Sequence, residues 1–477
     1  MFTLLHKQPA PICEAEIEAA KQRTRSISVL EGSMWAIMFG CGESFVAPFA
    51  VFLRAGNHAM ALLGTLPVAL GALAQVFSAS LAERCGRRRP ILIGTVALHA
   101  LAYLPLFWIP VFFPSVGVPA VVLCFAAAMV FGNMAGPVWT SLMGDVVAGD
   151  SRGRYFARRG RILVLIMLAS MVPAGYLLAW CQRHGHEWRG YGFLFTVVIL
   201  ARGFGSFLFT RHYEPPLHVD RDGYFSFWSF LRRSPHSNFA RFTFAVALMT
   251  GATNIAGPFF ILYMRRDLHW TYVQWAMNTV VFLLAQFLFV NWWGGLCDRH
   301  GNRSVLLATS VILPVLPVMW ALSTDYRVLL CVQVLSGCAW SGFNLAVSNF
   351  ILDAVTPPKR ARAFSYFSVV NGAFTLVGGS VIGAYLAGHL PTTYTLGPLH
   401  VRFISSLPGV FVVSGLVRLG AALVMLPRFQ EVRAATPISP GQILWRLSLG
   451  EPILGQISQV LAFLRAPLRR RGRRDPD

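Results

Sequence analysis

Residues 79–88 read ASLAERCGRR and residues 294–303 read GGLCDRHGNR, so one order of leucine, acid, arginine and glycine occurs twice. The two copies lie 215 residues apart in a chain of 477 residues. Each copy follows one long apolar segment and precedes another. The repeat therefore predicts a duplicated unit, in which this short polar stretch connects two apolar helices.

Three further pairs of stretches repeat at a similar spacing, each at the equivalent place in its half. They are Asp145–Arg154 with Asp353–Arg362 at an offset of 208, Ala47–Phe49 with Gly257–Phe259 at 210, and Arg202 with Arg418 at 216. Four matches at nearly one spacing indicate that the whole chain is a duplicated six-helix unit.

The composition indicates that lipid is the main solvent of this chain. Hydrophobic residues make up 55% and charged residues 13%, and the mean hydropathy is +0.56. Apolar segments long enough to span a bilayer recur almost from end to end. Twelve are predicted, at about 31–53, 59–80, 90–110, 118–143, 161–181, 191–210, 239–263, 272–293, 304–323, 327–351, 363–388 and 407–426.

The placement of the basic residues explains the net charge of +21 without a nucleic acid partner. With the N-terminus taken as cytoplasmic, 32 lysines and arginines fall on the cytoplasmic side and 7 outside. This asymmetry follows the positive-inside rule. We therefore expect a multi-pass protein of the cell inner membrane with both termini in the cytoplasm.

The polar segments define the expected domains. Residues 1–27 form a cytoplasmic N-terminal segment without the apolar core of a signal peptide, and 212–238 form a cytoplasmic central loop. Between them and after them lie two six-helix bundles, 28–211 and 239–428. The tail, 429–477, combines apolar residues at helical spacing with a polybasic end, which predicts an amphipathic helix on the cytoplasmic leaflet. A disordered basic tail is the alternative.

The loop pattern resembles the G-x-L-x-D-R-x-G-R-R signature of the major facilitator superfamily over about residues 28–430. The first copy departs from it at Ala79 and Glu83, whereas the second keeps glycine, leucine, aspartate, arginine and glycine. The resemblance implies an all-α fold of twelve transmembrane helices in two pseudo-symmetric six-helix bundles. It also implies alternating access of a small solute to a central cavity.

The charged residues of the loops suggest a gate. Residues with side chains rarely make so short a reversal, so Gly86 and Gly301 are expected to supply backbone freedom. In the resembling family, carboxylate and guanidinium groups here fasten the cytoplasmic gate. We expect this latch to use Glu83, Arg84, Asp298, Arg299, Asp145, Arg152, Arg154, Asp353, Arg360 and Arg362. The alternative is that the arginines only set topology.

Glu43 is the only acidic residue that this reading places well inside an apolar segment. An unpaired carboxylate costs about 3 kcal/mol in the bilayer and takes up a proton readily. Glu43 is therefore a candidate for proton coupling or substrate binding, with Asn254 near its counterpart in the second half. A permanently protonated or hydrogen-bonded glutamate beside Ser44 is the alternative.

The two intramembrane arginines, Arg202 and Arg418, occupy equivalent positions, and symmetry favours a structural role within each bundle. Recognition of an anionic solute is the alternative. Further polar and aromatic residues lie in helices that the resembling family uses to line its cavity. These cavity candidates are Gln75, Asn133, Trp139, Asn278, Gln286, Trp340, Asn344 and Asn371, each of which could instead join helices together.

The favoured function is a secondary transporter of a small organic solute, coupled to protons and monomeric. Efflux by antiport and uptake by symport both remain open. A non-transporting membrane sensor or scaffold is the second class. The chain contains no Walker, G-x-S-x-G or H-E-x-x-H motif, so an enzyme is not expected. Its 8 cysteines and 12 histidines show no metal-binding spacing, so neither a metal nor a cofactor is expected.

Overall fold

The structure is a computed structural model of the chain, and all statements below refer to the residues that it describes. These are residues 14–148, 151–216, 227–232, 237–356, 359–396, 399–436 and 438–451. Within these ranges, 12 helical segments are long and apolar enough to cross a membrane. The predicted all-α fold with twelve transmembrane helices in two pseudo-symmetric bundles is confirmed.

The chain divides into two compact units. Unit 1 comprises residues 1–224, 257–277 and 364–389. Its elements are α1 (Glu14–Cys41), η1 (Glu43–Phe45), α2 (Val46–Phe52), α3 (Asn57–Cys85), α4 (Arg89–Phe112), η2 (Pro114–Val116), α5 (Gly117–Val146), α6 (Arg152–Arg183), α7 (Glu187–Phe209), α10 (Phe259–Leu262), η4 (Tyr263–Asp267), η6 (Val377–Gly383) and α16 (Ala384–His389), with the first part of α11 (Tyr272–His300) and most of α15 (Arg360–Leu376).

Unit 2 comprises residues 225–256, 278–363 and 390–477. Its elements are α8 (Phe227–Arg232), α9 (Asn238–Ala256), the remainder of α11, α12 (Asn302–Ile312), α13 (Val315–Leu322), α14 (Tyr326–Ala354), the start of α15, β1 (Thr393–Leu396), β2 (Leu399–Arg402), α17 (Leu407–Arg428) and α18 (Pro440–Ser448). The antiparallel β1–β2 hairpin was not predicted. The compact units are grouped by packing and are each made of several stretches of sequence. The bundle limits 28–211 and 239–428 therefore stay predictions.

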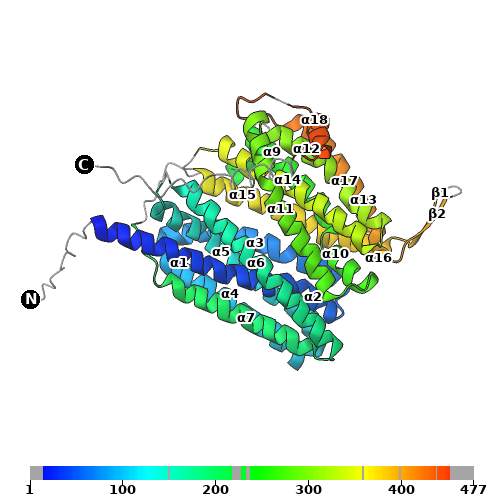
Figure 1. Cartoon of the computed structure of the whole chain (residues 1–477), viewed down its shortest axis with the longest axis horizontal. Helices are drawn as coiled ribbons and strands as arrows, with labels where there is room; N and C mark the ends of the chain where they lie inside the picture. The colour runs from blue at the N-terminus through cyan, green and yellow to red at the C-terminus, as the bar shows by residue number, and fades with distance from the viewer. Residues whose placement is uncertain are drawn as a thin grey trace, which may run out of the picture. The chain divides into compact units, whose positions relative to one another are not determined.

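Equivalent helices pack together in the two units, as a duplicated fold requires. In unit 1, α1 packs against α6 and α7, and α4 packs against α5 and α7. Figure 1 shows α1, α4, α6 and α7 side by side. In unit 2, α9 packs against α17 and α12 packs against α14, which are the counterparts of the α1–α7 and α4–α5 pairs.

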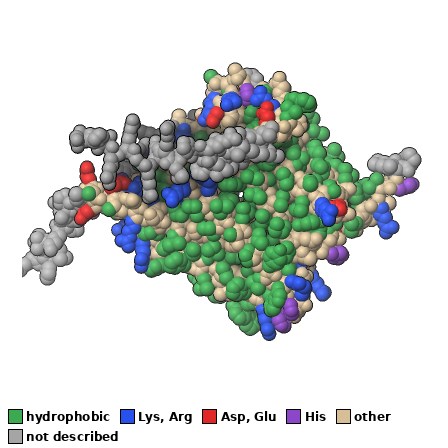
Figure 2. Space-filling model, viewed as in Figure 1, with side chains coloured by type: hydrophobic (Ala, Val, Ile, Leu, Met, Phe, Trp, Pro, Cys, Tyr) green, Lys and Arg blue, Asp and Glu red, His purple; other side chains and the backbone are tan. Residues whose placement is uncertain are grey.

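The surface matches a lipid environment. Large hydrophobic side chains such as Phe77, Leu123 and Leu200 are more than 60% exposed. Figure 2 shows hydrophobic side chains over much of one face, with lysine and arginine gathered in a few groups. So much exposed apolar surface is tolerated only where lipid covers it.

Several helix limits differ from the sequence prediction. The first span begins at Glu14, well before the predicted residue 31, and a 3₁₀ turn at η1 interrupts it. α6 begins at Arg152 instead of residue 161. The first turns of α1 and α6 are charged, and a hydropathy criterion detects only the apolar part of a helix. The predicted helix starts therefore lie too late in the sequence.

Candidate functional site

A cavity of about 360 Å³ lies within unit 1. This volume falls in the range of small-molecule sites. Six helices contribute to its wall. The lining residues are Glu31 and Trp35 from α1, Gln75 from α3, Val96 from α4, Gly132, Asn133, Ala135, Gly136 and Trp139 from α5, Arg159 and Leu163 from α6, and Arg202 and Phe209 from α7.

Two arginines share one buried carboxylate in this cavity. Glu31 Oε1 lies 3.5 Å from an Arg202 guanidinium nitrogen, and Glu31 Oε2 lies 3.4 Å from an Arg159 nitrogen. The side chains of Glu31 and Arg202 are only 6% and 4% exposed. The Arg159 Nε donates to the Ser28 carbonyl at 3.1 Å. Glu31 is therefore ion-paired on both oxygens, with one positive charge in excess.

Aromatic and amide groups complete the wall. The Arg159 guanidinium lies 4.3 Å from the centre of the Trp139 ring, a cation–π contact. The Gln75 Nε2 donates to Asn133 Oδ1 at 3.0 Å, and Asn133 donates to the Met129 carbonyl at 2.8 Å. The cavity thus offers flat apolar surfaces beside amide donors and acceptors.

Glu43 lies in the interruption of the first span and is half-buried. Gly42, at φ −130° and ψ −66°, leaves the helix there, so Glu43 starts the 3₁₀ turn η1. Arg202 interacts electrostatically with both Glu43 and Glu31. One arginine therefore interacts electrostatically with two carboxylates, Glu31 of α1 and Glu43 of η1.

A buried polar pair on α4 adjoins this group. His99 and Tyr103 are 2% and 0% exposed. Both ring nitrogens of His99 and the hydroxyl of Tyr103 have no hydrogen-bond partner among the described residues. His99 packs against Gly132 of the cavity wall. Unsatisfied buried polar groups are costly and commonly mark bound water or a functional site.

The structure brings together four of the predicted residues, since Gln75, Asn133, Trp139 and Arg202 all line the cavity. Asn371 of α15 is half-buried in unit 1 and donates to the Phe367 carbonyl. The other candidates belong to unit 2: Asn254 of α9, whose amide donates to the Thr250 carbonyl; Asn278 and Gln286 of α11, buried and half-buried; and Trp340 and Asn344 of α14, half-buried and exposed.

Arg202 and Arg418 have different partners despite their equivalent positions. Arg418 donates to Ser414 Oγ at 3.2 Å and to the Leu313 and Thr253 carbonyls at 3.1 and 3.3 Å. Arg418 therefore binds one hydroxyl and two backbone carbonyls, whereas Arg202 interacts with carboxylates and lines a cavity. Only one copy of the pair thus has the surroundings of a ligand-binding arginine.

The glycines of the repeated loop adopt the expected left-handed backbone, with φ values of 64° at Gly86 and 82° at Gly301. The expectation of backbone freedom is confirmed. A carboxylate then holds the start of the following helix in each copy: Glu214 accepts from the backbone N–H of Arg89 at 3.0 Å, and Glu431 accepts from that of Arg303 at 2.7 Å. Neither glutamate was predicted from the sequence to have this role.

Three carboxylates of the predicted gate pair with arginines that were not in the predicted set. Asp145 pairs with Arg88 at 2.6 Å. Asp353 and Asp298 both pair with Arg433, at 2.7 and 3.4 Å. Hydrogen bonding with Asp353 raises the pKa of the Arg433 guanidinium above its ordinary value. Two of the loop arginines in the predicted gate, Arg152 and Arg360, donate to backbone carbonyls instead.

Arg152 and Arg360 bind carbonyls at the end of the preceding helix. Arg152 donates to the Gly144 and Val147 carbonyls at 2.6 and 3.4 Å. Arg360 donates to the Leu352 and Val355 carbonyls at 2.9 and 3.2 Å. Helix ends carry unpaired carbonyls and partial negative charge, which explains this choice of partner. Among the remaining gate residues, Arg84, Arg154 and Arg299 are exposed, Arg362 is half-buried, and the Glu83 side chain lies outside the described residues.

A second polar cluster lies in unit 1 at the ends of the helices opposite to the repeated loops. The Tyr191 hydroxyl donates to that of Tyr272 at 2.9 Å, and Tyr272 in turn donates to Glu187. The Arg265 guanidinium lies 3.7 Å from the centre of the Tyr272 ring and 3.9 Å from Glu187. These contacts attach the segment 257–277, from the second half of the sequence, to helix α7.

The tail prediction is only partly described. Helix α18 begins with a capping box at Ser439 and Gln442 and packs against α12. Ile443 is completely buried there. This first turn therefore covers protein instead of lipid, and residues 452–477 lie outside the described part.

Glu31 and Arg159 line the cavity but were not predicted from the sequence, and Glu43 is not the only acidic residue within a described span. Glu31 stands at the predicted start of its span, and Arg159 was assigned to a loop. The signal was the helical spacing of Ser28, Glu31 and Trp35, which places them on one face of a longer helix.

Twelve spans among the described residues define an integral, multi-pass membrane protein, and one of its units contains a cavity with charged lining residues. A family model of the Major Facilitator Superfamily matches residues 33–251 and 242–468. The chain therefore belongs to the Major Facilitator Superfamily and is a transporter, not an enzyme.

Curated relatives align over short stretches. The chain is 24% identical over 153 residues to the MFS antiporter QDR3 of Candida albicans, covering 30% of the chain and 22% of that protein. It is 26% identical over 154 residues to the quinolone resistance protein NorA of Staphylococcus aureus, covering 31% and 39%. The alignments thus span less than two fifths of either relative.

Solved structures match nearly the whole fold at low identity. A mutant of the nucleoside transporter NupG superposes with a TM-score of 0.63 at 14% identity, covering 86% of this chain and 100% of that one. A D-xylose–proton symporter gives 0.62 at 13% identity, covering 87% and 98%. At such identities the likeness concerns the fold alone.

The carboxylates at Arg433 are expected to differ in their contribution to stability. Asp353 is 14% exposed and also accepts from Asn302 at 2.8 Å, whereas Asp298 is 74% exposed. Asp353→Asn should lower the free energy of unfolding by about 1 kcal/mol, and Asp298→Asn should change it little. Melting temperatures of the two purified variants test this order, and a larger loss in Asp298→Asn would contradict it.

Proposed function

We propose that this protein is a secondary transporter that moves a small organic solute by alternating access and couples this movement to protons. The observation that carries the proposal is the buried Glu31 carboxylate, shared by Arg159 and Arg202 inside a cavity of solute size. A carboxylate that is ion-paired in one state and protonated in another links proton binding to a conformational equilibrium.

The same arrangement suggests a solute class. Protonation of Glu31 would release two guanidinium groups, which bind carboxylates and phosphates well. Trp35, Trp139 and Phe209 offer apolar surface around them. These features favour a solute with an apolar or aromatic body and one anionic group.

Glu43 is proposed as a second proton site. Glu43 and Glu31 interact with the same Arg202, so protonation of either carboxylate changes the electrostatic environment of the other. The unpartnered His99 and Tyr103 support a hydrated path near this group. Asn254 lies at the equivalent place in the second half. It is proposed as the uncharged counterpart of Glu43 in proton coupling or substrate binding.

Orientation, gating and assembly are further parts of the proposal. The excess of arginine on one set of loops supports cytoplasmic termini in an inner membrane and a monomeric carrier. Asp145, Asp298 and Asp353 are proposed to act in the gate at these loops through Arg88 and Arg433. The relatives named as an antiporter and as a quinolone resistance protein favour export, and transport should be measured in both directions.

The test is a comparison of the wild type with Glu31→Gln and Glu43→Gln. Purified protein is screened by thermal shift against organic anions, nucleosides, pentoses and quinolones, at one acidic and one alkaline pH. Hits are followed in proteoliposomes with a trapped pH dye. We expect solute-driven proton movement in the wild type and its loss, by tenfold or more, in Glu31→Gln.

Glu187→Gln serves as the matched control, because it removes a carboxylate outside the cavity. Proton movement that survives in both Glu31→Gln and Glu43→Gln would contradict the proposed coupling. Solute binding without transport in either direction would instead favour a membrane sensor or scaffold.

A further inference from the structure

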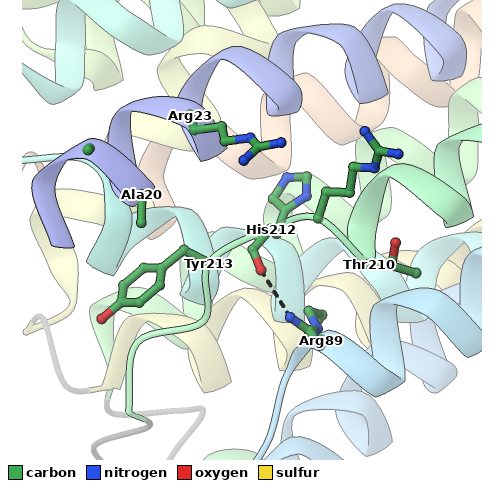
Figure 3. A pocket seen from close by; sticks show the side chains of 8 residues that line it. Ala20, Arg23, Arg89, Thr210, His212 and Tyr213 are labelled. Atoms are coloured by element: carbon green, nitrogen blue, oxygen red, sulfur yellow. Dashed lines mark hydrogen bonds between the residues drawn. The ribbon is translucent and has the colours of Figure 1, made fainter. Parts of the chain in front are cut away.

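A second cavity lies in unit 1 beside the repeated loop and is lined almost entirely by basic or neutral groups. Its volume is about 390 Å³. Its lining residues are Ala19, Ala20 and Arg23 of α1, Arg89 of α4, and Thr210, Arg211, His212 and Tyr213 at and after the end of α7. Figure 3 shows Arg23, Arg89 and His212 arranged around it.

The three arginines of this basic pocket retain free donors. Arg89 uses one nitrogen to donate to the His212 carbonyl at 3.3 Å. Arg211 stacks over the Phe207 ring at 5.1 Å. Arg23 is exposed and has no partner within the described ranges. Two carboxylates adjoin these residues in the sequence: Glu214 accepts from the backbone N–H of Arg89, and Glu18 pairs with Arg25 at 2.7 Å.

His212 provides an acceptor beside these donors. It is 1% exposed, and its Nδ1 lies 3.1 Å from the Leu208 carbonyl oxygen. A carbonyl cannot donate, so Nδ1 carries the proton and neutral Nε2 is an acceptor. Nε2 is buried and has no partner among the described residues. Burial lowers the pKa of His212, which favours this neutral form.

We propose that the basic pocket binds a phosphate group that carries or adjoins a hydroxyl. The anionic oxygens would accept from Arg23, Arg89 and Arg211, and the hydroxyl would donate to His212 Nε2. Two ligands have this chemistry: the phosphoglycerol headgroup of a membrane lipid, and free hydrogen phosphate. Either would hold the N-terminal turns of α1 against the ends of α4 and α7.

The experiment measures thermal unfolding of the purified full-length protein in detergent. One arm titrates phosphatidylglycerol, with phosphatidylcholine as the lipid control. The other arm titrates inorganic phosphate, with sodium chloride at equal ionic strength as the salt control. Each arm is run on the wild type, Arg23→Gln and Arg89→Gln, and on Arg87→Gln as a basic control outside the pocket.

We expect the phosphate-bearing ligand to raise the melting temperature of the wild type and of Arg87→Gln at the same concentration. Half-saturation should require about tenfold more ligand in Arg23→Gln and in Arg89→Gln. A response to phosphatidylglycerol alone identifies a lipid site, and a response to inorganic phosphate identifies a free anion site.

Absence of a response in both arms would overturn the proposal. So would equal half-saturation in the wild type, Arg23→Gln and Arg89→Gln, since the ligand would then bind elsewhere. Because Arg23 is exposed, Arg23→Gln keeps the fold and decides the matter even where Arg89→Gln unfolds.

Discussion

Replacement of Arg202 by methionine should abolish transport and destabilise the protein by about 3–5 kcal/mol, the cost of removing one member of a buried ion pair. Glu31 is 6% exposed in the cavity and would keep Arg159, at 3.4 Å, as its remaining ion-pair partner. Glu43 would lose the same positive charge. The thermal stability of Arg202→Met, measured across pH, tests this prediction.

The pH dependence separates the two intramembrane arginines. Acidification neutralises the carboxylates left by Arg202→Met, so the deficit of this variant relative to the wild type should shrink toward acidic pH. Within the described part of the chain, Arg418 donates to one hydroxyl and to backbone carbonyls and to no carboxylate. The deficit of Arg418→Met should therefore not depend on pH. Parallel behaviour of the two variants would show that carboxylates do not determine the role of Arg202.

A double variant gives a second check. Glu31→Gln combined with Arg202→Met removes both members of the Glu31–Arg202 ion pair and should recover part of the stability lost in the single variant. Transport should stay absent, because the proposed coupling requires a titratable group. Recovery of transport would rule out Glu31 as the coupling carboxylate.

Insertion of a side chain at Gly40 should disrupt the packing of α1 against α6. A Cβ at this position would meet the Met167 carbonyl oxygen at 2.5 Å and would also collide with Ser170 Oγ. The carbonyl belongs to a helix backbone and cannot move aside. Overpacking of this kind costs about 1–3 kcal/mol or more, and close approach through small residues is the usual basis of helix association in lipid.

Gly203→Ala is the matched control for Gly40→Ala, because a Cβ at Gly203 meets nothing within 4 Å. We expect a large loss of monodisperse protein in size-exclusion chromatography for Gly40→Ala and for the bulkier Gly40→Val, and none for Gly203→Ala. Equal yields for the two alanine variants would mean that α1 and α6 do not pack this closely in the membrane.

The fold was predictable because its signals are long and repeated. Twenty-residue apolar segments register in any hydropathy measure, and the loop glycines Gly86 and Gly301 mark the same reversal twice. The extent of α1 was not predictable, because its first turns carry Glu14, Glu16 and Glu18, which resemble a loop in composition.

The site was predictable only in part. Gln75, Asn133 and Trp139 were identifiable as polar or amphipathic residues within spans, and all line the cavity. Glu31 was hidden because its pairing with Arg159 joins residues of sequence separation 128. An ion pair between distant helices leaves no local pattern in the sequence, so its members resemble separate interfacial charges.

The carbonyl contacts of Arg152 and Arg360 have a consequence for measuring the transport cycle. Each arginine donates two hydrogen bonds across its turn to carbonyls at the end of the preceding helix. These bonds connect α5 with α6, and α14 with α15, at one end of each pair. A spectroscopic label on one helix of such a pair reports the displacement of its companion near that turn. Distance changes between labelled partners of a pair would then locate bending farther along the helices, for example at Pro173 of α6.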